Sequence, residues 1–79
     1  MTRLADPRAC TTVDRKIAKR LKTARTEAGL SQNALAQEIG TSFQMVQKQE
    51  RGINRIAASR LLSIAKALGK PITYFYDGL

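Results

Sequence analysis

The chain has 79 residues, the size of one small domain, and a chain this short buries only about 60% of its unfolded surface. The net charge is +8, from 14 Lys and Arg against 6 Asp and Glu, which favours a polyanionic partner such as nucleic acid. One cysteine and no histidine exclude an internal disulfide, a Cys/His zinc finger and the commonest general base. The composition therefore indicates a binding module without metal or cofactor, not an enzyme.

The beginning of the chain differs from the rest. Residues 1–11 contain Pro7 and no consistent apolar period, so we expect a flexible arm that carries Arg3 and Arg8. No apolar run approaches the roughly 20 residues of a membrane-spanning helix, and no signal-peptide core is recognised. Few aromatic residues beside abundant Leu, Ile and Ala favour helices packed on helices, so residues 12–79 are expected to form one all-α domain without a membrane partner.

Apolar residues recur at helical spacing over about 13–28, which predicts the first helix. Its expected inner stripe is Val13, Ile17, Leu21, Ala24 and Ala28. Asp14 lies in the first turn, where a negative charge is favourable, and Gly29 ends the helix. Six basic residues between Arg15 and Arg25 are expected to face mostly outward, either solvated or in partial contact with phosphates.

Two short helices follow with very little chain between them. The second is capped by Ser31 and continues to Ile39, and a capping box that starts at Thr41 predicts the third helix, over about 42–51. Gly40 between them is free to adopt a positive φ. A helix, a tight glycine turn and a second helix form the motif that places the second helix in a DNA major groove.

The end of the chain predicts two further helices. The fourth spans roughly 56–68, with Gly69 as its terminator. Its expected inner stripe is Leu61, Ile64, Ala65 and Leu68. Residues 72–76 after Pro71 are expected to form a short fifth helix, because a strand there would have no partner strand. The predicted fold is therefore an all-α, compact bundle of about five helices that contains a helix-turn-helix.

The third predicted helix has two different faces. A step of about 100° per residue directs Ser42, Met45, Val46 and Gln49 toward the core. The opposite face consists of Phe43, Gln44, Gln47, Lys48 and Arg51. Gln can pair with adenine and Lys can reach guanine, and no acidic residue interrupts this face, although Glu50 lies at its border. The face is typical of a DNA-reading surface, and an ordinary solvated helix surface is the alternative.

The stretches Gly29-Leu-Ser-Gln-Asn-Ala-Leu-Ala-Gln-Glu-Ile-Gly40 and Thr41-Ser-Phe-Gln-Met-Val-Gln-Lys-Gln-Glu-Arg-Gly52 resemble the Cro/CI-type (XRE) helix-turn-helix family. The segments 64–69 and 74–79 are also similar to members of that family, so that the resemblance covers about residues 13–79. It implies a lambda-repressor-like bundle and a bacterial, cytoplasmic, nucleoid-associated transcription regulator. Such a regulator binds a two-fold-related operator of double-stranded DNA.

The resemblance also implies roles for individual residues. The base-reading positions are Phe43, Gln44 and Lys48, with Gln47 beside them. The positions that contact the DNA backbone are Gln32, Ser42, Asn54 and Arg55, and Arg51 on the outward face is assigned to the backbone as well. In the family, the residue at Gln32 also braces the recognition helix. Asn54 could instead be a turn residue that uses its side chain locally.

Three residues depart from the family pattern. Phe43 stands where many members carry a polar residue, so that it could pack on a thymine methyl or wedge against the second helix. Gln49 replaces the usual inner apolar residue and leaves a polar group to satisfy. Ala57 stands where a capping Ser is common, so the fourth helix is expected to start without a side-chain cap.

The C-terminal apolar residues are more numerous than so small a core can bury, which predicts a homodimer surface. This surface is assigned to Ile72, Tyr74, Phe75, Tyr76 and Leu79. The alternative is that these side chains simply close the bundle. A second functional reading also remains open: an antitoxin or antiactivator that acts mainly on a protein partner, a toxin or an activator, through this surface, with DNA binding secondary.

Overall fold

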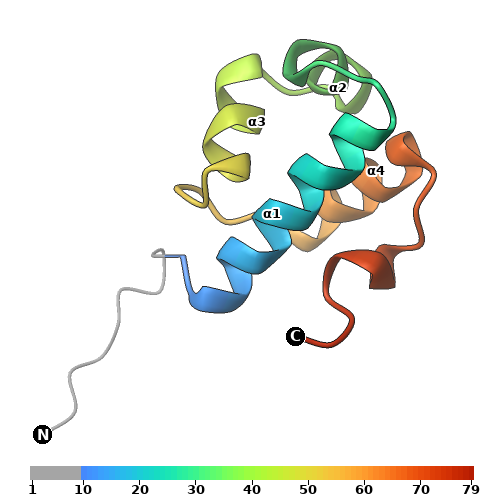
Figure 1. The fold of residues 1–79 in the computed structure, drawn as a ribbon. Coiled ribbons are helices and arrows are strands. Elements are labelled where there is room, and N and C mark those ends of the chain that lie inside the picture. The colour runs from blue at the N-terminus through green and yellow to red at the C-terminus, as the bar shows by residue number, and fades with distance from the viewer. Residues whose placement is uncertain (1–9) are drawn as a thin grey trace, which may run out of the picture.

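A computed structural model of the chain describes residues 10–79 (Figure 1). These residues form four α-helices and one short 3-10 helix, and no strand occurs among them. The elements are α1 (Thr12–Glu27), α2 (Gln32–Ile39), α3 (Phe43–Glu50), α4 (Ala58–Leu68) and η1 (Ile72–Phe75). The predicted all-α class is confirmed, and the expected fifth helix is a single 3-10 turn. The predicted arm lies outside the described residues over 1–9.

The first helix begins with a reciprocal cap. The Thr11 backbone N–H donates to Asp14 Oδ2 at 2.8 Å, and Thr11 Oγ1 accepts from the Asp14 backbone N–H at 3.2 Å. Two orphan N–H groups at the helix start are thereby satisfied. Thr11 therefore belongs to the folded domain, although the sequence placed it in the arm.

The buried side of α1 is shorter along the helix than the sequence predicted, and it also includes Ala18 and Arg25. Leu21 and Ala24 are buried as expected, with Ile17 half-buried beside them. Val13 and Ala28 are exposed, so their assignment to the inner stripe is wrong. They lie at the two ends of the helix, where periodicity continues but the neighbouring elements do not cover the surface.

The turn between α2 and α3 is built on Gly40, whose φ of +73° lies in the left-handed region as expected. The Thr41 backbone N–H donates to the Ala36 carbonyl at 2.9 Å, so Thr41 still belongs to the cap of α2. The predicted capping box at Thr41 is therefore wrong. Ser42 caps α3 instead, and its Oγ accepts from the Met45 backbone N–H at 3.1 Å.

The start of α4 lies two residues after the predicted Ile56. Ala57 is its N-cap residue and makes no side-chain hydrogen bond, as predicted. The inner stripe of this helix is confirmed, because Leu61, Ile64, Ala65 and Leu68 are all buried.

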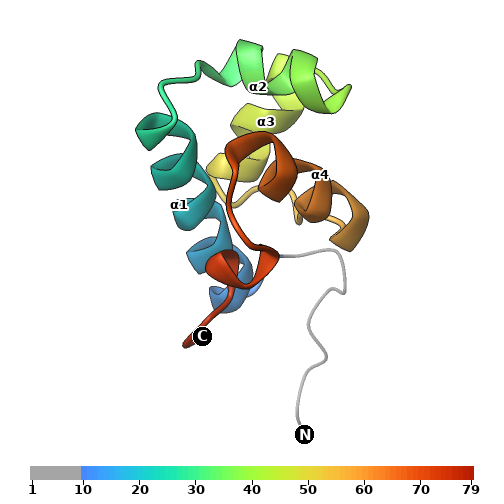
Figure 2. The ribbon, with the colours of Figure 1, turned by 90° about the vertical axis from the view of Figure 1, so that its right-hand side faces the viewer.

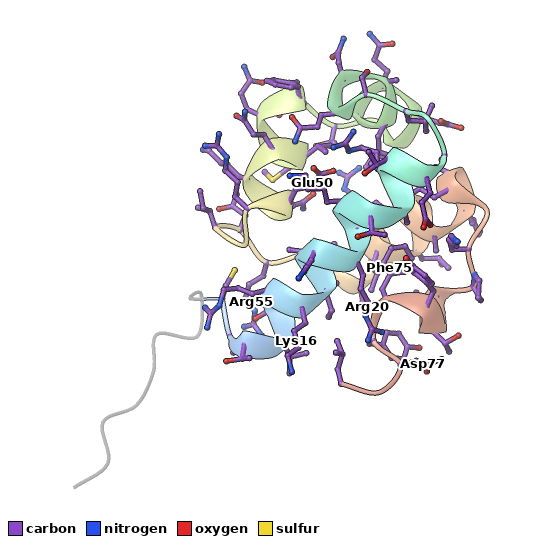
Figure 3. The ribbon with its side chains drawn as sticks, viewed as in Figure 1. Lys16, Arg20, Glu50, Arg55, Phe75 and Asp77 are labelled. Atoms are coloured by element: carbon purple, nitrogen blue, oxygen red, sulfur yellow. The ribbon has the colours of Figure 1, made fainter. Side chains whose placement is uncertain are left out.

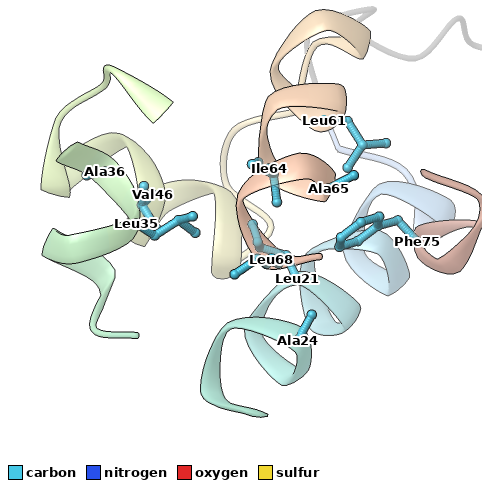
Figure 4. Packing of buried hydrophobic residues seen from close by; sticks show 10 residues of the cluster. All are labelled: Leu21, Ala24, Leu35, Ala36, Val46, Leu61, Ile64, Ala65, Leu68 and Phe75. Atoms are coloured by element: carbon cyan, nitrogen blue, oxygen red, sulfur yellow. The ribbon is translucent and has the colours of Figure 1, made fainter. Parts of the chain in front are cut away.

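All the helices contribute to a single hydrophobic core (Figure 4). It contains Leu21, Ala24, Leu35, Ala36, Val46, Leu61, Ile64, Ala65, Leu68 and Phe75. Phe75 is fully buried, at 0% exposed, and Tyr74 meets its ring edge-on with the ring centres 5.1 Å apart. The assignment of Phe75 to a dimer surface is thus corrected. Burial of such a side chain contributes roughly 1.5–3 kcal/mol to folding, so η1 closes the bundle through it.

Two arginines donate hydrogen bonds to backbone carbonyl groups of other segments: Arg20 to the C-terminal segment and Arg60 to the end of α2. Arg20 of α1 donates through Nη1 to the Tyr74 carbonyl at 3.0 Å and to the Asp77 carbonyl at 2.6 Å (Figure 3). Arg60 of α4 donates to the Ile39 carbonyl at the end of α2, at 2.5 Å. These contacts fix the C-terminal segment on α1 and orient α4 against the helix-turn-helix.

Candidate nucleic-acid interface

The outer face of α3 is mostly exposed, as its sequence pattern predicted. Phe43, Gln44, Lys48 and Arg51 are exposed, and Gln47 is half-buried. On the inner side, Val46 and Gln49 are buried and Met45 is half-buried. Ser42 is exposed, so its assignment to the inner face is wrong. As the N-cap residue, Ser42 lies outside the regular turn of the helix, where a 100° step no longer places side chains.

A buried ion pair fixes the inner side of α3 against α1. Arg25 donates through Nε to Glu50 Oε2 at 2.5 Å and through Nη2 to Oε1 at 3.0 Å. The Arg25 side chain is 10% exposed and the Glu50 side chain is 2% exposed. Arg25 Nη1 also donates to the Leu30 carbonyl at 2.7 Å, ahead of α2. Arg25 therefore links α1 to α3 and to the loop before α2.

The same carboxylate also holds Gln32, at the start of α2. Gln32 Nε2 donates to Glu50 Oε1 at 2.9 Å, so α1, α2 and α3 meet in one network of polar side chains around Glu50, which is labelled in Figure 3. The Gln32 contact matches the bracing role that the family resemblance implied. Sequence reasoning missed the Arg25–Glu50 pair, because Arg25 was counted with the outward charges and Glu50 was placed at the border of the exposed face. The available signal was helical phase: position 25 follows Ala24 and lies four residues after Leu21, on the buried side.

The loop from α3 to α4 brings further predicted residues beside the exposed face. Arg51 and Arg55 are exposed there, and Asn54 is half-buried, with its Nδ2 3.5 Å from Met45 Sδ. Gly52 has a φ of +71°, and a Cβ on it would lie 2.9 Å from the Arg15 Cγ. The loop thus needs a glycine to pass close to α1.

Arg55 is linked to the start of α1. Its Nε lies 3.0 Å from Asp14 Oδ2, and nearly half of the Arg55 side chain remains exposed. The pKa of the Asp14 carboxyl is held below its ordinary value chiefly by the hydrogen bond from the Thr11 backbone N–H. The charge of Arg55 adds to this lowering, against a partial opposing effect of burial.

The residues predicted to form a dimer surface lie at the other end of the molecule from α3 (Figures 1 and 2). Ile72 and Tyr74 are half-buried, whereas Tyr76 is 43% exposed and Leu79 is 39% exposed. Four of the five predicted residues are therefore at least partly accessible, whereas Phe75 is buried and cannot belong to the surface.

A metal site and a membrane-spanning helix each place requirements on residues 10–79. No group of three or more Cys, Asp or Glu side chains in this part of the chain is arranged to hold a metal ion. Within the same range, no helix is both long and apolar enough to cross a bilayer.

Comparison with known proteins agrees with this geometry. The sequence model of the helix-turn-helix family matches residues 21–75, from the middle of α1 to the end of η1. This chain belongs to the Cro/CI-type (XRE) helix-turn-helix family. Family membership confirms the fold that the sequence predicted and the class of DNA-binding transcription regulators.

Within the Cro/CI-type family, one relative is an uncharacterized transcriptional regulator in the ATPase CF(0) region of Rhodospirillum rubrum. It is 51% identical over 75 residues, which make up 95% of this chain and 69% of the relative. An uncharacterized regulator of Sinorhizobium medicae is 38% identical over 82% of this chain. The chain spans only 47% of that protein's length.

Solved structures give the same result and one useful contrast. The restriction-modification controller protein C.AhdI from Aeromonas hydrophila superposes with a TM-score of 0.75 at 32% identity, over 78% of this chain and 94% of that one. The hydroxypropylphosphonic acid epoxidase of S. wedmorenis also matches, with a TM-score of 0.74 at 26% identity. That match covers 80% of this chain but only 34% of the epoxidase. The Cro/CI-type fold therefore also occurs as part of a larger enzyme, and function has to be argued from the surface.

Proposed function

We propose that this chain is a sequence-specific, double-stranded DNA-binding regulator that reads the major groove with the outer face of α3 and has no catalytic role. One observation carries the proposal: α3 presents Gln44 and Lys48 on a face where both side chains are exposed among the described residues. Amide and ammonium groups match the edges of adenine and guanine in the major groove. Phe43 lies at the start of the same face, where its ring would contact a thymine methyl.

Backbone contacts would come from residues that flank α3. Arg51 and Arg55 are exposed beside its C-terminal end, and Ser42 lies at its N-terminal end. Gln32 donates one N–H of its side-chain amide to Glu50, and the second N–H of this amide can donate to a phosphate. Asn54, in the same loop, completes the proposed set. These groups would fix the register on the duplex, while the face of α3 supplies sequence preference.

The proposed DNA complex contains a homodimer, because one short helix reads only a few base pairs. Ile72, Tyr74, Tyr76 and Leu79 offer the dimer surface, and they lie away from α3, so a second copy would not cover the DNA face. Two copies related by a two-fold axis would present their α3 helices to half-sites about 34 Å apart. The proposed location is the bacterial cytoplasm, at the nucleoid.

Selection of binding sites from random double-stranded DNA tests this function directly. We expect enriched sequences with two-fold symmetry, and an affinity whose logarithm falls with the logarithm of the salt concentration by about 0.9 for each phosphate neutralised. A pool without an enriched sequence, together with binding that is independent of salt, would rule out the proposal. That pair of results would favour the alternative in which the chain acts on a protein partner.

A further inference from the structure

A polar hollow lies behind the proposed DNA-reading helix, between α3, the loop that follows it and the start of α4. Its volume is about 320 Å³, at the lower end of the range for small-molecule sites. The side chains of Gln49, Asn54, Arg55 and Arg60 line it together with Thr41 and Met45. Two of these residues carry positive charge, and no acidic residue lines the hollow.

The side of the hollow formed by α3 contains a hydrogen-bond acceptor that has no donor within residues 10–79. Gln49 is only 4% exposed, and its Oε1 finds no hydrogen-bond donor among the described residues. A buried polar atom in this state destabilises the fold, so a ligand that donates a hydrogen bond to it would recover that free energy. The terminal torsion of a glutamine is soft, and Oε1 can therefore turn toward the hollow.

The remaining walls contain hydrogen-bond donors. Among residues 10–79, the acceptor of Asn54 Nδ2 is the Met45 sulfur at 3.5 Å, and a thioether is a weak acceptor. Arg60 donates through Nη1 to the Ile39 carbonyl, and its guanidinium carries five N–H donors in all. Arg55 adds a second guanidinium, which shares its charge with Asp14. The hollow therefore presents several donors and a single acceptor.

We propose that this hollow binds a small oxyanion that also carries a hydroxyl group, with hydrogen phosphate as the simplest example, and that the bound ion weakens DNA binding. The anionic oxygens accept from Asn54 and the two guanidinium groups, and the hydroxyl donates to Gln49 Oε1. A DNA phosphodiester carries no proton at neutral pH, so it cannot satisfy Gln49. The unpaired acceptor thus distinguishes a free ion from the DNA backbone.

The effect on DNA follows from shared residues. Arg55 and Asn54 line the hollow and also belong to the proposed backbone contacts, so a bound anion neutralises charge that the duplex needs. This second half of the inference rests on the proposed function. Binding of the ion itself does not, because the hollow is formed by the protein alone.

The test is an NMR titration of the DNA-free protein with phosphate and with sulfate, at neutral pH and constant ionic strength. Sulfate matches phosphate in size and charge but has no hydroxyl. We expect saturable shifts at the backbone amides of residues 41, 49 and 54–60, and an affinity for phosphate about fivefold higher, as one net hydrogen bond provides. Shifts that are linear and equal for the two ions, or that map elsewhere, would overturn the proposal.

Variants of Gln49 isolate the hydroxyl contact. Gln49→Leu removes the acceptor and is expected to bind phosphate and sulfate equally, with no loss of thermal stability because an unpaired buried group is removed. Gln49→Met serves the same purpose with an unbranched side chain should the leucine not fit. Gln37→Met, on the exposed surface of α2, is the matched control and should keep the preference for phosphate. A phosphate preference that survives both Gln49 variants would refute the site.

Operator binding is measured separately, at the same ionic strength. We expect phosphate to weaken operator binding more than sulfate does in the parent protein, and equally in the Gln49 variants. Equal effects of the two ions in the parent protein would refute the coupling. If phosphate binds in the titration but no operator sequence is found, the ion site is supported and only the proposed DNA-binding function is refuted.

Discussion

Gln44 and Lys48 project from the exposed side of α3, so their side chains are not part of the hydrophobic core. Replacing either by alanine should therefore leave the fold intact and remove about 1–3 kcal/mol of discrimination between operator and random DNA. Competition binding with the two DNAs measures the difference. Lys66→Ala, exposed on α4, is the control for simple loss of charge, and operator preference that is unchanged in both α3 variants would contradict the site assignment.

Glu50 has the opposite character, because it is buried beneath the reading face. Glu50→Ala leaves the Arg25 guanidinium buried and unpaired, and we expect it to lower the free energy of unfolding by about 3–5 kcal/mol. Urea denaturation measures this loss. The double variant Arg25→Met with Glu50→Leu should recover most of the stability, since two apolar side chains can replace a buried pair. No recovery in the double variant would show that the network contributes more than charge compensation.

Asp14 introduces a dependence of stability on pH. Its pKa is lowered in the folded state, so the folded chain favours the carboxylate more than the unfolded chain does. The resulting stabilisation is present above the ordinary pKa of 3.8 and is lost as the pH falls through the lowered value. We expect Asp14→Asn to be less stable than the parent at pH 7 and to approach it in strongly acidic buffer. Urea unfolding over a pH series measures the difference, and a constant difference would contradict this account.

At the scale of elements, the two glycine turns around α3 differ in what surrounds them. Gly40 and Gly52 both have positive φ, but only Gly52 faces a neighbour, the Arg15 Cγ. Gly40→Ala should cost about 1–2 kcal/mol through backbone strain alone. Gly52→Ala should cost more, because Arg15 must also move. Thermal unfolding of the two variants ranks them, and a smaller loss for Gly52→Ala would show that the Arg15 side chain yields freely.

The same scale shows where sequence reasoning about elements succeeds. The stripe of α4 and the positive φ of Gly40 depend on local spacing and on a residue's own conformational freedom, and both are as predicted. The cap of α3 depends on how far the cap of α2 extends. Thr41 and Ser42 both suit an N-cap position, and only the hydrogen bond from the Thr41 N–H to the Ala36 carbonyl assigns the cap to Ser42.

At the scale of the whole molecule, the proposed homodimer depends on the exposed residues Tyr76 and Leu79. Tyr76→Glu should place a charge in the proposed dimer surface and shift the association equilibrium toward monomer, which analytical ultracentrifugation over a range of protein concentrations would measure. Leu62→Glu, equally exposed but on α4, is the matched control. Binding to an isolated half-site should be preserved, whereas cooperative binding to the full operator should be lost. An unchanged association constant would exclude this surface.

Periodicity, glycine positions and net charge by themselves determined that this chain is an all-α helix-turn-helix protein with one bare, uncharged-to-basic face on its third helix. These are local properties, set by the helical repeat of 3.6 residues per turn and by the backbone conformations that each residue type can adopt. Only the tertiary structure decided that Arg25 and Glu50 pair in the interior, that Phe75 closes the core, and that Gln49 faces a polar hollow. Each of these depends on which side chains from distant segments meet in the folded chain, and a buried charge is costly unless an opposite charge lies beside it.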